Sequence, residues 1–590
     1  MRSILRMSER GRHLSTRTRL VGLISAAALL VACTEPLSAP IPAAHPDDPT
    51  PRRGGTLHLA SIGDMRGVDP AVVGDALSFS ASELVFAGLV DYDKNAKVVP
   101  DLAERYEVAE GGSVYRFFLR EGVLFHDGTE VQADDVKRSV ERALHPSTPG
   151  PFSNLYQPIV GYEAFTTKKA EHLDGVVVEG RYVVAFHLRE PDSRFLFTAA
   201  LPPMRPVCKS AGDRYSDTWA PCGAGPFKIL PGAWERGRSI TLTRHDGYFK
   251  PGRPYLDSVT WIFNVSRSVE VYKFQDGDLD STRELGDGDV RRFARDPRWK
   301  PYTAFDADKS VTGEFMNTEI PPFDNIEVRR AVAAAIDREH YHLIKPISLS
   351  PATQAIPPSV PGYDPTFKGQ VYDYPAALEH MKRAGYPYDP ETGKGGYEPV
   401  IPYYAYTQGT SVYAAQILQQ ELARIGLRLD IRLVNFPTFL SLAGRRKAVA
   451  MTAPGWQMDY PDPSDFFDTV FASDAISDEG SFNYAFYKNP ALDELLKRAH
   501  HELDQKARYA LYGEANRIVC DDAPEAFTFF FHFFVVSQPY VHDFDRHPVW
   551  SSYAGDAWID RDTKHASPEG KLGLNVLWPD PAQRRSRGRP

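Results

Sequence analysis

The sequence contains few cysteines and no apolar run of the length that a membrane-spanning helix requires. Only 4 of its 590 residues are cysteine, which excludes a small fold held together mainly by disulfides. The one stretch apolar enough to suggest a membrane, residues 20–31, is shorter than the roughly 20 residues of a spanning helix. With 42% hydrophobic and 25% charged residues, the composition is that of a globular protein, and about 150 residues per domain predicts two to four domains.

An excess of positive charge is also absent. Lys and Arg number 68 against 77 Asp and Glu, so the formal net charge is −9. Residues 1–32 hold six arginines and one glutamate, so their removal would take away five net positive charges and leave about −14. Because nucleic acids and anionic membrane surfaces are bound by basic patches, we expect no nucleic-acid partner.

The first 32 residues have the features of an export signal. Arginines precede the apolar run and small residues follow it, which is the order of a secretory signal peptide. The run ends Leu30-Val31-Ala32-Cys33, which resembles the bacterial lipoprotein box, whose cysteine is acylated and becomes the first residue of the mature chain. We therefore expect a signal peptide over 1–32 and a lipid anchor at Cys33 on the periplasmic side of the membrane. The alternative is an ordinary signal peptide with an incidental Cys33.

A proline-rich segment follows the anchor. Residues 34–53 contain six prolines and no apolar periodicity, which is typical of a flexible tether. We expect the tether to extend over residues 33–53 and the folded part to begin after it.

Three cysteines remain in the folded part. Cys208 and Cys222 flank a polar loop, and a bridge closing a loop of this size would stabilise the fold by roughly 3 kcal/mol. Export places both where disulfides persist, so a disulfide is favoured over two free thiols. Cys520 then remains as a small buried side chain. No Cys-x-x-Cys pair occurs, so we expect no zinc site and no other metal or cofactor.

Strand-like and helix-like segments alternate along the folded part. Alternating or apolar runs predict strands at residues 55–60, 115–120, 176–178, 182–188, 240–244, 258–264 and 427–433. Helical periodicity predicts helices at 133–144, 328–336, 375–384, 412–425 and 491–499. The aromatic run at 527–536 predicts one strand buried on both faces. Together they predict an α/β or mixed α+β fold with mixed sheets.

A series of short motifs occurs in a distinctive order along this region. They are Gly54-Gly-Thr-Leu57, Val68-Asp-Pro70, Phe117-Phe-Leu-Arg-Glu-Gly-Val-Leu-Phe-His-Asp-Gly-Thr129, Cys222-Gly-Ala-Gly-Pro-Phe227, Phe274-Gln-Asp-Gly-Asp-Leu-Asp280, Met316-Asn-Thr-Glu-Ile-Pro-Pro-Phe-Asp-Asn325, Val328-Arg-Arg-Ala331 with Ala335-Ile-Asp-Arg338, Gly455-Trp-Gln-Met-Asp-Tyr-Pro-Asp-Pro463 and Tyr487-Lys-Asn-Pro-Ala-Leu-Asp-Glu-Leu-Leu496. In this order, over roughly residues 54–560, the chain resembles the family-5 solute-binding proteins of peptide ABC importers.

The resemblance implies two lobes joined by a hinge, with a cleft that closes on a solute. It implies three domains, the first of them discontinuous. Domain I would comprise 54–76, 198–310 and 511–575, domain II 77–197, domain III 311–510, and residues 576–590 a basic tail that we expect to be disordered. It also implies a monomer that binds peptides or a related small solute and delivers them to permease subunits.

The resemblance places the ligand at two segments. In peptide binders of this family, the residue matching Asp459 pairs with the ligand's α-ammonium group, and the stretch matching Gly455 and Trp456 lies beside the ligand backbone. A cationic group that loses water in a closing cleft needs such a fixed anion. Asp64, Met65 and Arg66 match the segment that contacts the ligand backbone from the other wall. The alternatives are that Asp459 caps a turn in a proline-rich loop and that residues 61–69 form a surface loop.

The chain departs from the family at two places. Some oligopeptide binders have an Arg two positions before Gly455 that attracts the ligand carboxylate, and this chain has Ala453 there, which puts the usual recognition of a free C-terminus in doubt. A cysteine pair of some members is also missing, because Ser310 and Gln457 stand at its positions.

Catalytic motifs are missing as well. There is no Gly-x-Ser-x-Gly elbow and no Gly-rich phosphate loop, and the stretch from His501 has Gln505 where a zinc protease has its second histidine. We therefore expect a binding protein and not an enzyme. Three alternatives stay open: a binder of a nickel chelate, an oligosaccharide or an opine-like compound; an envelope hydrolase; and a binding protein that serves a receptor.

Overall fold

The computed structural model describes residues 50–560 except 284, 306–308, 408–409, 545–546, 548 and 551–552. The predicted signal peptide over 1–32, the anchor at Cys33, nearly all of the tether and the tail over 576–590 lie outside the described residues. Among the residues that are described, no helix combines the length and the apolar character needed to cross a membrane.

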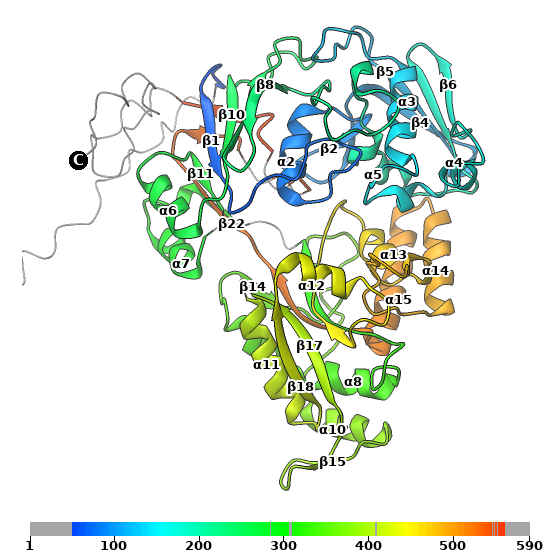
Figure 1. Cartoon of the computed structure of the whole chain (residues 1–590), viewed down its shortest axis with the longest axis vertical. Helices are drawn as coiled ribbons and strands as arrows, with labels where there is room; N and C mark the ends of the chain where they lie inside the picture. The colour runs from blue at the N-terminus through cyan, green and yellow to red at the C-terminus, as the bar shows by residue number, and fades with distance from the viewer. Residues whose placement is uncertain are drawn as a thin grey trace, which may run out of the picture.

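The upper lobe in Figure 1 comprises the described residues up to position 305 and from position 534 onward. Its first sheet has the order β1-β10-β9-β8, with strands β1 (Thr56–Ala60), β10 (Ser258–Ile262), β9 (Ser239–Arg244) and β8 (Phe227–Glu235). The N-terminal strand β1 runs parallel to β10 and the other pairs are antiparallel. The first strand of the fold is therefore held by a segment far along the chain.

The second sheet of the upper lobe is wholly antiparallel, in the order β4-β5-β7-β6. Its strands are β4 (Ala103–Ala109), β5 (Val114–Leu119), β7 (Val183–His187) and β6 (Val176–Gly180). The accompanying elements are α2 (Ala76–Val85), β2 (Val90–Tyr92), β3 (Val98–Pro100), α3 (Ala133–Leu144), α4 (Tyr162–Thr166) and α5 (Phe195–Ala199). Helix α3 begins where predicted because the Asp135 carboxylate accepts a hydrogen bond from the Gln132 amide at 3.1 Å.

The lower lobe, residues 310–531, is built on a seven-stranded mixed sheet with helices around it (Figure 1). The strand order is β14-β21-β13-β19-β17-β18, with β20 also paired to β13. The strands are β13 (Ser310–Met316), β14 (Leu349–Pro351), β17 (Val400–Tyr406), β18 (Arg428–Val434), β19 (Met451–Thr452), β20 (Trp456–Gln457) and β21 (Glu525–Phe531). The helices are α8 (Ile326–Ala335), α9 (Arg338–His342), α10 (Tyr374–Arg383), α11 (Ser411–Ala423), α12 (Phe436–Ala443), α13 (Ser464–Val470), α14 (Pro490–His501) and α15 (Gln505–Asp522).

A small sheet lies where the chain passes between the lobes. It consists of β11 (Ser281–Thr282), β22 (Phe534–Ser537) and β12 (Thr303–Phe305), and helices α6 (Arg267–Gln275) and α7 (Asp287–Arg295) lie beside it. Strand β12 leads into β13, and β21 leads into β22. Two adjacent crossings thus connect the lobes on one side of the molecule.

The aromatic run at 527–536 is not one strand. It divides into β21, which pairs with β13 in the lower lobe, and β22, which pairs with β11 and β12. The chain leaves one sheet at Phe531 and enters another at Phe534, and both strands are largely buried. Because β21 lies in the lower sheet, the predicted third segment of domain I, 511–575, is divided between the lobes. The other predicted domain boundaries stay predictions.

Cys208 and Cys222 form a disulfide with their Cα atoms 5.5 Å apart, the pairing favoured from the sequence. Cys520 is buried and not in a disulfide. Burial raises the pKa of its thiol to about 12, so it stays protonated at neutral pH.

The lobes also touch on the side away from β22 in Figure 1, below α5 and above α13 and α14. Arg194 of the upper lobe pairs with Asp192 of its own lobe and with Asp468 of α13. His500 Nε2–H of α14 donates to the same Asp468 carboxylate at 2.8 Å, and the Ser193 amide donates to the His500 carbonyl at 2.8 Å. Residues 192–194, Asp468 and His500 form what we call the lobe clasp.

Candidate ligand-binding site

A cavity of about 640 Å³ lies between the lobes and receives side chains from both. The upper lobe contributes residues near α2, around position 152 and at 549–550, and the lower lobe contributes parts of β13, β17, α11, α12 and residues 453–459. Its aromatic lining residues are Phe79, Phe152, Tyr403, Tyr406, Phe436, Trp456, Phe482, Tyr484, Phe529, Phe531, Phe533 and Trp550. A cavity of this size, with aromatic walls and with charged and polar side chains set among them, is typical of a small-molecule site.

Residues 453–457 form one wall through a tight turn between two short strand pairings. Strands β19 and β20 both pair with β13, and Ser310 lies opposite Gln457. Gly455 between them has φ 71°, and a Cβ there would come within 2.9 Å of Thr312 Oγ1. Only glycine fits both the backbone conformation and the space. The two positions that match the family's cysteine pair are therefore neighbours across a strand pair.

Trp456 presents an indole at the wall of the cavity. Its ring packs edge-on against Phe482 with centroids 5.2 Å apart, and its Nε1–H donates to Asp465 Oδ2 at 3.2 Å. Because the polar edge of the indole is satisfied by Asp465, its orientation is set by the protein and not by a ligand.

Asp459 places a half-buried carboxylate in the cavity. Its amide donates to Asp465 Oδ2 at 2.9 Å, and none of the described residues pairs with its carboxylate. Burial raises the pKa of Asp459 to about 7 and that of Asp465 well above its usual value, and two acids so close oppose each other's ionisation. The carboxylate pair thus lacks a cation.

Asp462, and not Asp459, caps the turn in the proline-rich loop. Asp462 Oδ1 accepts from the Ser464 amide at 3.0 Å, and the same carboxylate is held by Arg508 of α15, 2.6 Å from Arg508 Nη2 to Oδ1. Asp462 therefore supplies the carboxylate that caps this turn, and the Asp459 carboxylate lies in the cavity wall.

Of the three residues predicted for the other wall, one lines the cavity and two do not. Arg66 lines the cavity and is exposed. Met65 is 1% exposed and packs in the core of the upper lobe, while the Asp64 carboxylate accepts a hydrogen bond from the Gly237 amide at 2.6 Å. Neither Asp64 nor Met65 is among the residues that line the cavity, so their predicted ligand contacts stay predictions.

Sequence reasoning missed an acid on the floor of the cavity. Glu314 of β13 lines it, is 1% exposed and accepts a hydrogen bond from the Tyr403 hydroxyl at 2.8 Å. Burial raises the pKa of Glu314 to about 8, so it carries a proton at neutral pH. The one available signal was that this glutamate is the single charged residue of the segment that forms β13.

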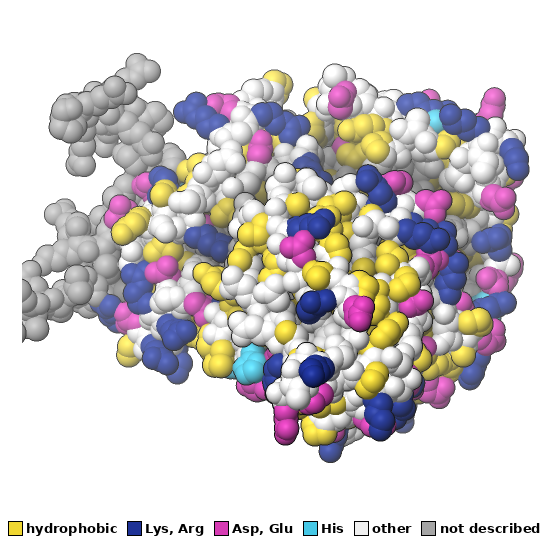
Figure 2. All heavy atoms as spheres, turned by 60° about the horizontal axis from the view of Figure 1, so that its bottom comes forward, with side chains coloured by type: hydrophobic (Ala, Val, Ile, Leu, Met, Phe, Trp, Pro, Cys, Tyr) yellow, Lys and Arg dark blue, Asp and Glu magenta, His cyan; other side chains and the backbone are white. Residues whose placement is uncertain are grey.

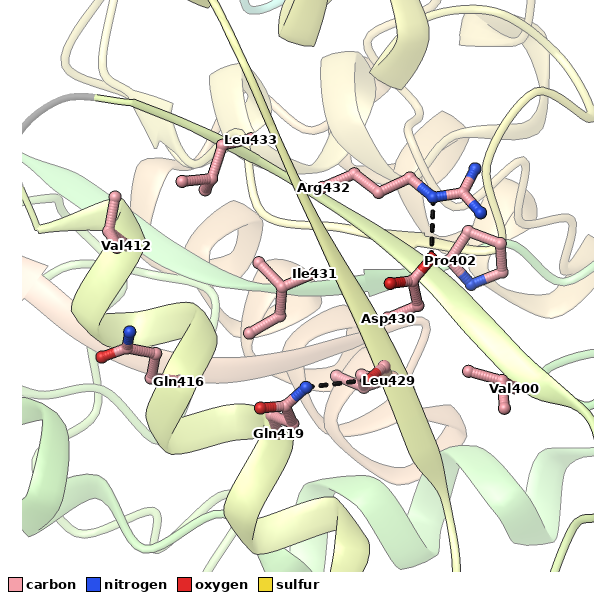
Figure 3. A pocket seen from close by; sticks show the side chains of 10 residues that line it. All are labelled: Val400, Pro402, Val412, Gln416, Gln419, Leu429, Asp430, Ile431, Arg432 and Leu433. Carbon is pink, nitrogen blue, oxygen red and sulfur yellow. Dashed lines mark hydrogen bonds and ion pairs between the residues drawn. The ribbon is translucent and has the colours of Figure 1, made fainter.

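A second hollow, of about 600 Å³, lies at the outer edge of the lower sheet (Figure 3). It is lined by β17, β18 and α11, where Gln419 Nε2 donates to the Leu429 carbonyl and Arg432 pairs with Asp430. The hollow touches none of the predicted site residues and has a wall from one lobe only, so it is not the candidate site.

Metal-ligating side chains come together at one point of the described chain, where Asp127 meets Cys208 and Cys222. The two sulfurs are joined in the disulfide and offer no thiolate. Acidic and basic side chains are interspersed over the face shown in Figure 2, which is unlike the basic stripe of a nucleic-acid interface.

Known proteins resemble this chain over most of its length. Residues 97–478 match the family model of the bacterial extracellular solute-binding proteins, family 5 Middle. The glutathione-binding protein GsiB of Escherichia coli (strain K12) is 28% identical in an alignment 483 residues long, which covers 78% of this chain and 85% of the relative.

Two solved structures share the fold. The periplasmic binding protein DppA from Helicobacter pylori, in complex with the peptide STSA, has a TM-score of 0.72 at 25% identity and covers 86% of this chain and 98% of its own. The binding protein AgaA from A. tumefaciens R10, in complex with agropinic acid, has a TM-score of 0.71 at 25% identity and covers 86% and 99%. They confirm the predicted mixed α/β periplasmic-binding-protein fold.

Proposed function

Because this chain belongs to the family 5 bacterial extracellular solute-binding proteins, we propose that it captures short peptides and delivers them to the permease of an ABC importer. The family assignment makes the chain an extracytoplasmic solute-binding protein and not an enzyme. Peptides as the solute, and a lipid anchor at Cys33 that keeps the protein at the membrane, are the parts that we propose.

One observation carries the peptide assignment: the carboxylate of Asp459 faces the cavity without a cation from any described residue. Burial alone raises its pKa to about 7. A ligand ammonium group would pair with the Asp459 carboxylate and lower the pKa of Asp459 again. The carboxylate would in turn compensate the ammonium group for the hydration that it loses in the closed cavity. The free N-terminus of a peptide is such a group.

The second support is the shape of the wall beside Asp459. The turn at Gly455 and the short strand β20 place main chain along the cavity, where an extended peptide can pair with it whatever its side chains are. The aromatic walls add apolar contact that tolerates different side chains. The cavity volume of about 640 Å³ suits a short peptide.

The mechanism that we propose is closure of the lobes on the solute. The lining comes from both lobes, so a ligand gains all of its contacts only when they are together, and this difference in affinity shifts the population to the closed form. The crossing between β21 and β22 is where the chain would bend.

The relatives support a peptide-like solute, since one is named for glutathione and another was solved with the peptide STSA. An opine is the second candidate, because AgaA holds agropinic acid and Ala453 stands where some oligopeptide binders have the Arg for a ligand carboxylate.

The test uses peptides with free and with acetylated N-termini. We expect Asp459→Asn to weaken the binding of free-amine peptides by about ten- to hundredfold in calorimetric titrations, and to change the binding of acetylated peptides much less. Asp213→Asn, at an exposed position outside the cavity, is the matched control. Equal losses for both kinds of peptide would remove the ammonium assignment.

Native mass spectrometry of the purified protein separates the other candidates. Retained ligands with the masses of intact short peptides would support the proposal. A retained opine mass would favour the second candidate, and cleavage of added peptides would contradict a binding protein.

A further inference from the structure

Arg66 is the only basic side chain among the described residues that line the cavity. The residue is exposed, and its guanidinium makes no ion pair or hydrogen bond with another described residue. Such a group is the counterpart of Asp459, which lies on the opposite lobe and also lacks a partner of opposite charge.

The backbone of Arg66 is held in place on the upper lobe while its side chain stays unpartnered. The Arg66 amide donates to Ser78 Oγ of α2 at 3.2 Å, and its carbonyl accepts from Arg236 Nη1 at 3.1 Å. The preceding Met65 is buried in the core. These contacts hold the main chain of Arg66 on the upper lobe, so its side chain extends from a defined point of the cavity wall.

No acidic side chain of the same wall forms an ion pair with Arg66 among the described residues. The acidic lining residue of the upper lobe is Asp75, and its Oδ1 caps α2 by accepting from the Ser78 amide at 3.0 Å. The other acidic lining residues, including Asp459 and Glu314, come from the lower lobe. When a cleft closes and water leaves, an unpaired guanidinium loses hydration, so an anion on the ligand stabilises the closed form.

We propose that Arg66 binds the carboxylate of the ligand while Asp459 binds its ammonium group, so that the ligand is a short peptide with both termini free, held end to end between the lobes. The planar guanidinium suits a carboxylate because it donates two parallel hydrogen bonds. This assignment rests on the proposed function and adds to it the recognition of the C-terminus, which Ala453 and Pro454 of the lower lobe cannot provide.

The test compares one peptide sequence in four forms, with the N-terminus free or acetylated and the C-terminus free or amidated. For the unmodified protein we expect amidation to weaken binding about ten- to hundredfold. In Arg66→Gln, free-acid and amidated peptides should bind with the same reduced affinity, and Arg66→Lys should restore part of the difference. Arg214→Gln, at an exposed position outside the cavity, is the control.

The outcomes separate this inference from the proposed function. If acetylation weakens binding but amidation does not, or if Arg66→Gln weakens both C-terminal forms equally, the role of Arg66 is overturned and peptide binding stands. If no form of the peptide binds, both are overturned. Because the Arg66 side chain has no partner in the described chain, Arg66→Gln should keep the thermal stability of the unmodified protein, which a melting curve checks.

Discussion

At the scale of the residue, the cavity is notable for ionisable side chains that have no partner of opposite charge among the described residues. Asp459 and Asp465 share a small space, and the two polar contacts of Asp465 are with groups of the same wall, Trp456 and the Asp459 amide. Motifs in the sequence pointed to Gly455, Trp456, Asp459 and Arg66, and all four line the cavity. Motifs could not show that Met65 points into the core, because a side chain's direction in a loop depends on what packs around it.

Glu314 yields a pH prediction at this scale. Its pKa in the folded protein is raised to about 8 by burial, so folding binds a proton that the unfolded chain releases above its own pKa near 4.5. The stabilising effect of this group is therefore complete at acidic pH and is lost as the pH rises toward 8.

We expect Glu314→Gln to remove that dependence. Between about pH 5 and pH 8, the free energy of unfolding of the unmodified protein should fall more steeply than that of the variant, by up to about 1.4 kcal/mol per pH unit. Urea unfolding at several pH values measures both slopes. Parallel curves would mean that Glu314 does not change its protonation on folding.

At the scale of the element, the sequence predicted those helices and strands whose formation depends on contacts between residues close together along the chain. The helix predicted at 133–144 is α3 with the same bounds, since its acidic first turn and amphipathic pattern are local features. The run at 527–536 has no local signal for its division into β21 and β22, because the division follows from which distant strands each half meets. The pairing of β20 with β13 is equally non-local.

Gly455→Ala tests the turn that joins β19 to β20. The added Cβ meets Thr312 Oγ1 at 2.9 Å and the backbone has φ 71°, so we expect a loss of about 1–2 kcal/mol in stability and weaker peptide binding, because residues 456–459 must shift. Thermal melts and calorimetry measure the two effects.

Gly232→Ala is the matched control for that variant. Its φ is 79° and a Cβ there meets nothing within 4 Å, and the position does not line the cavity. It should lower stability and leave affinity unchanged. Unchanged affinity in Gly455→Ala as well would show that this turn does not shape the site.

At the scale of the whole molecule, the cavity lies among aromatic walls from two lobes that are joined on one side by two chain crossings and on the other by the lobe clasp (Figure 1). In the clasp, burial by itself would raise the pKa of Asp468, but His500 and Arg194 hold that pKa at about 2. The carboxylate therefore stays charged and bridges α13, α14 and the upper lobe.

Arg194→Met tests the lobe clasp. The change leaves Asp192 and Asp468 close together without their shared cation, which disfavours the contact between the lobes. We expect a larger radius of gyration by small-angle scattering without ligand and about tenfold weaker ligand binding, since each tenfold corresponds to about 1.4 kcal/mol.

The control is Arg445→Met, which removes an exposed ion pair with Glu479 within the lower lobe and should change neither quantity. An unchanged radius and affinity for Arg194→Met would show that the clasp does not contribute to closure.

The amino-acid sequence by itself determined the family, the alternation of strands and helices, the disulfide pairing that was favoured, and the segments that carry Gly455, Trp456, Asp459 and Arg66. These depend on residue order and short-range patterns, which can be read along the chain. Only the tertiary structure decided that Asp462 caps the loop and leaves Asp459 unpaired, that Glu314 reaches the cavity floor, and that Arg66 and Asp459 belong to opposite lobes. Charge neutralisation and burial are set by neighbours far apart along the chain, such as Tyr403 for Glu314 and Arg508 for Asp462, so they exist only once the chain has folded.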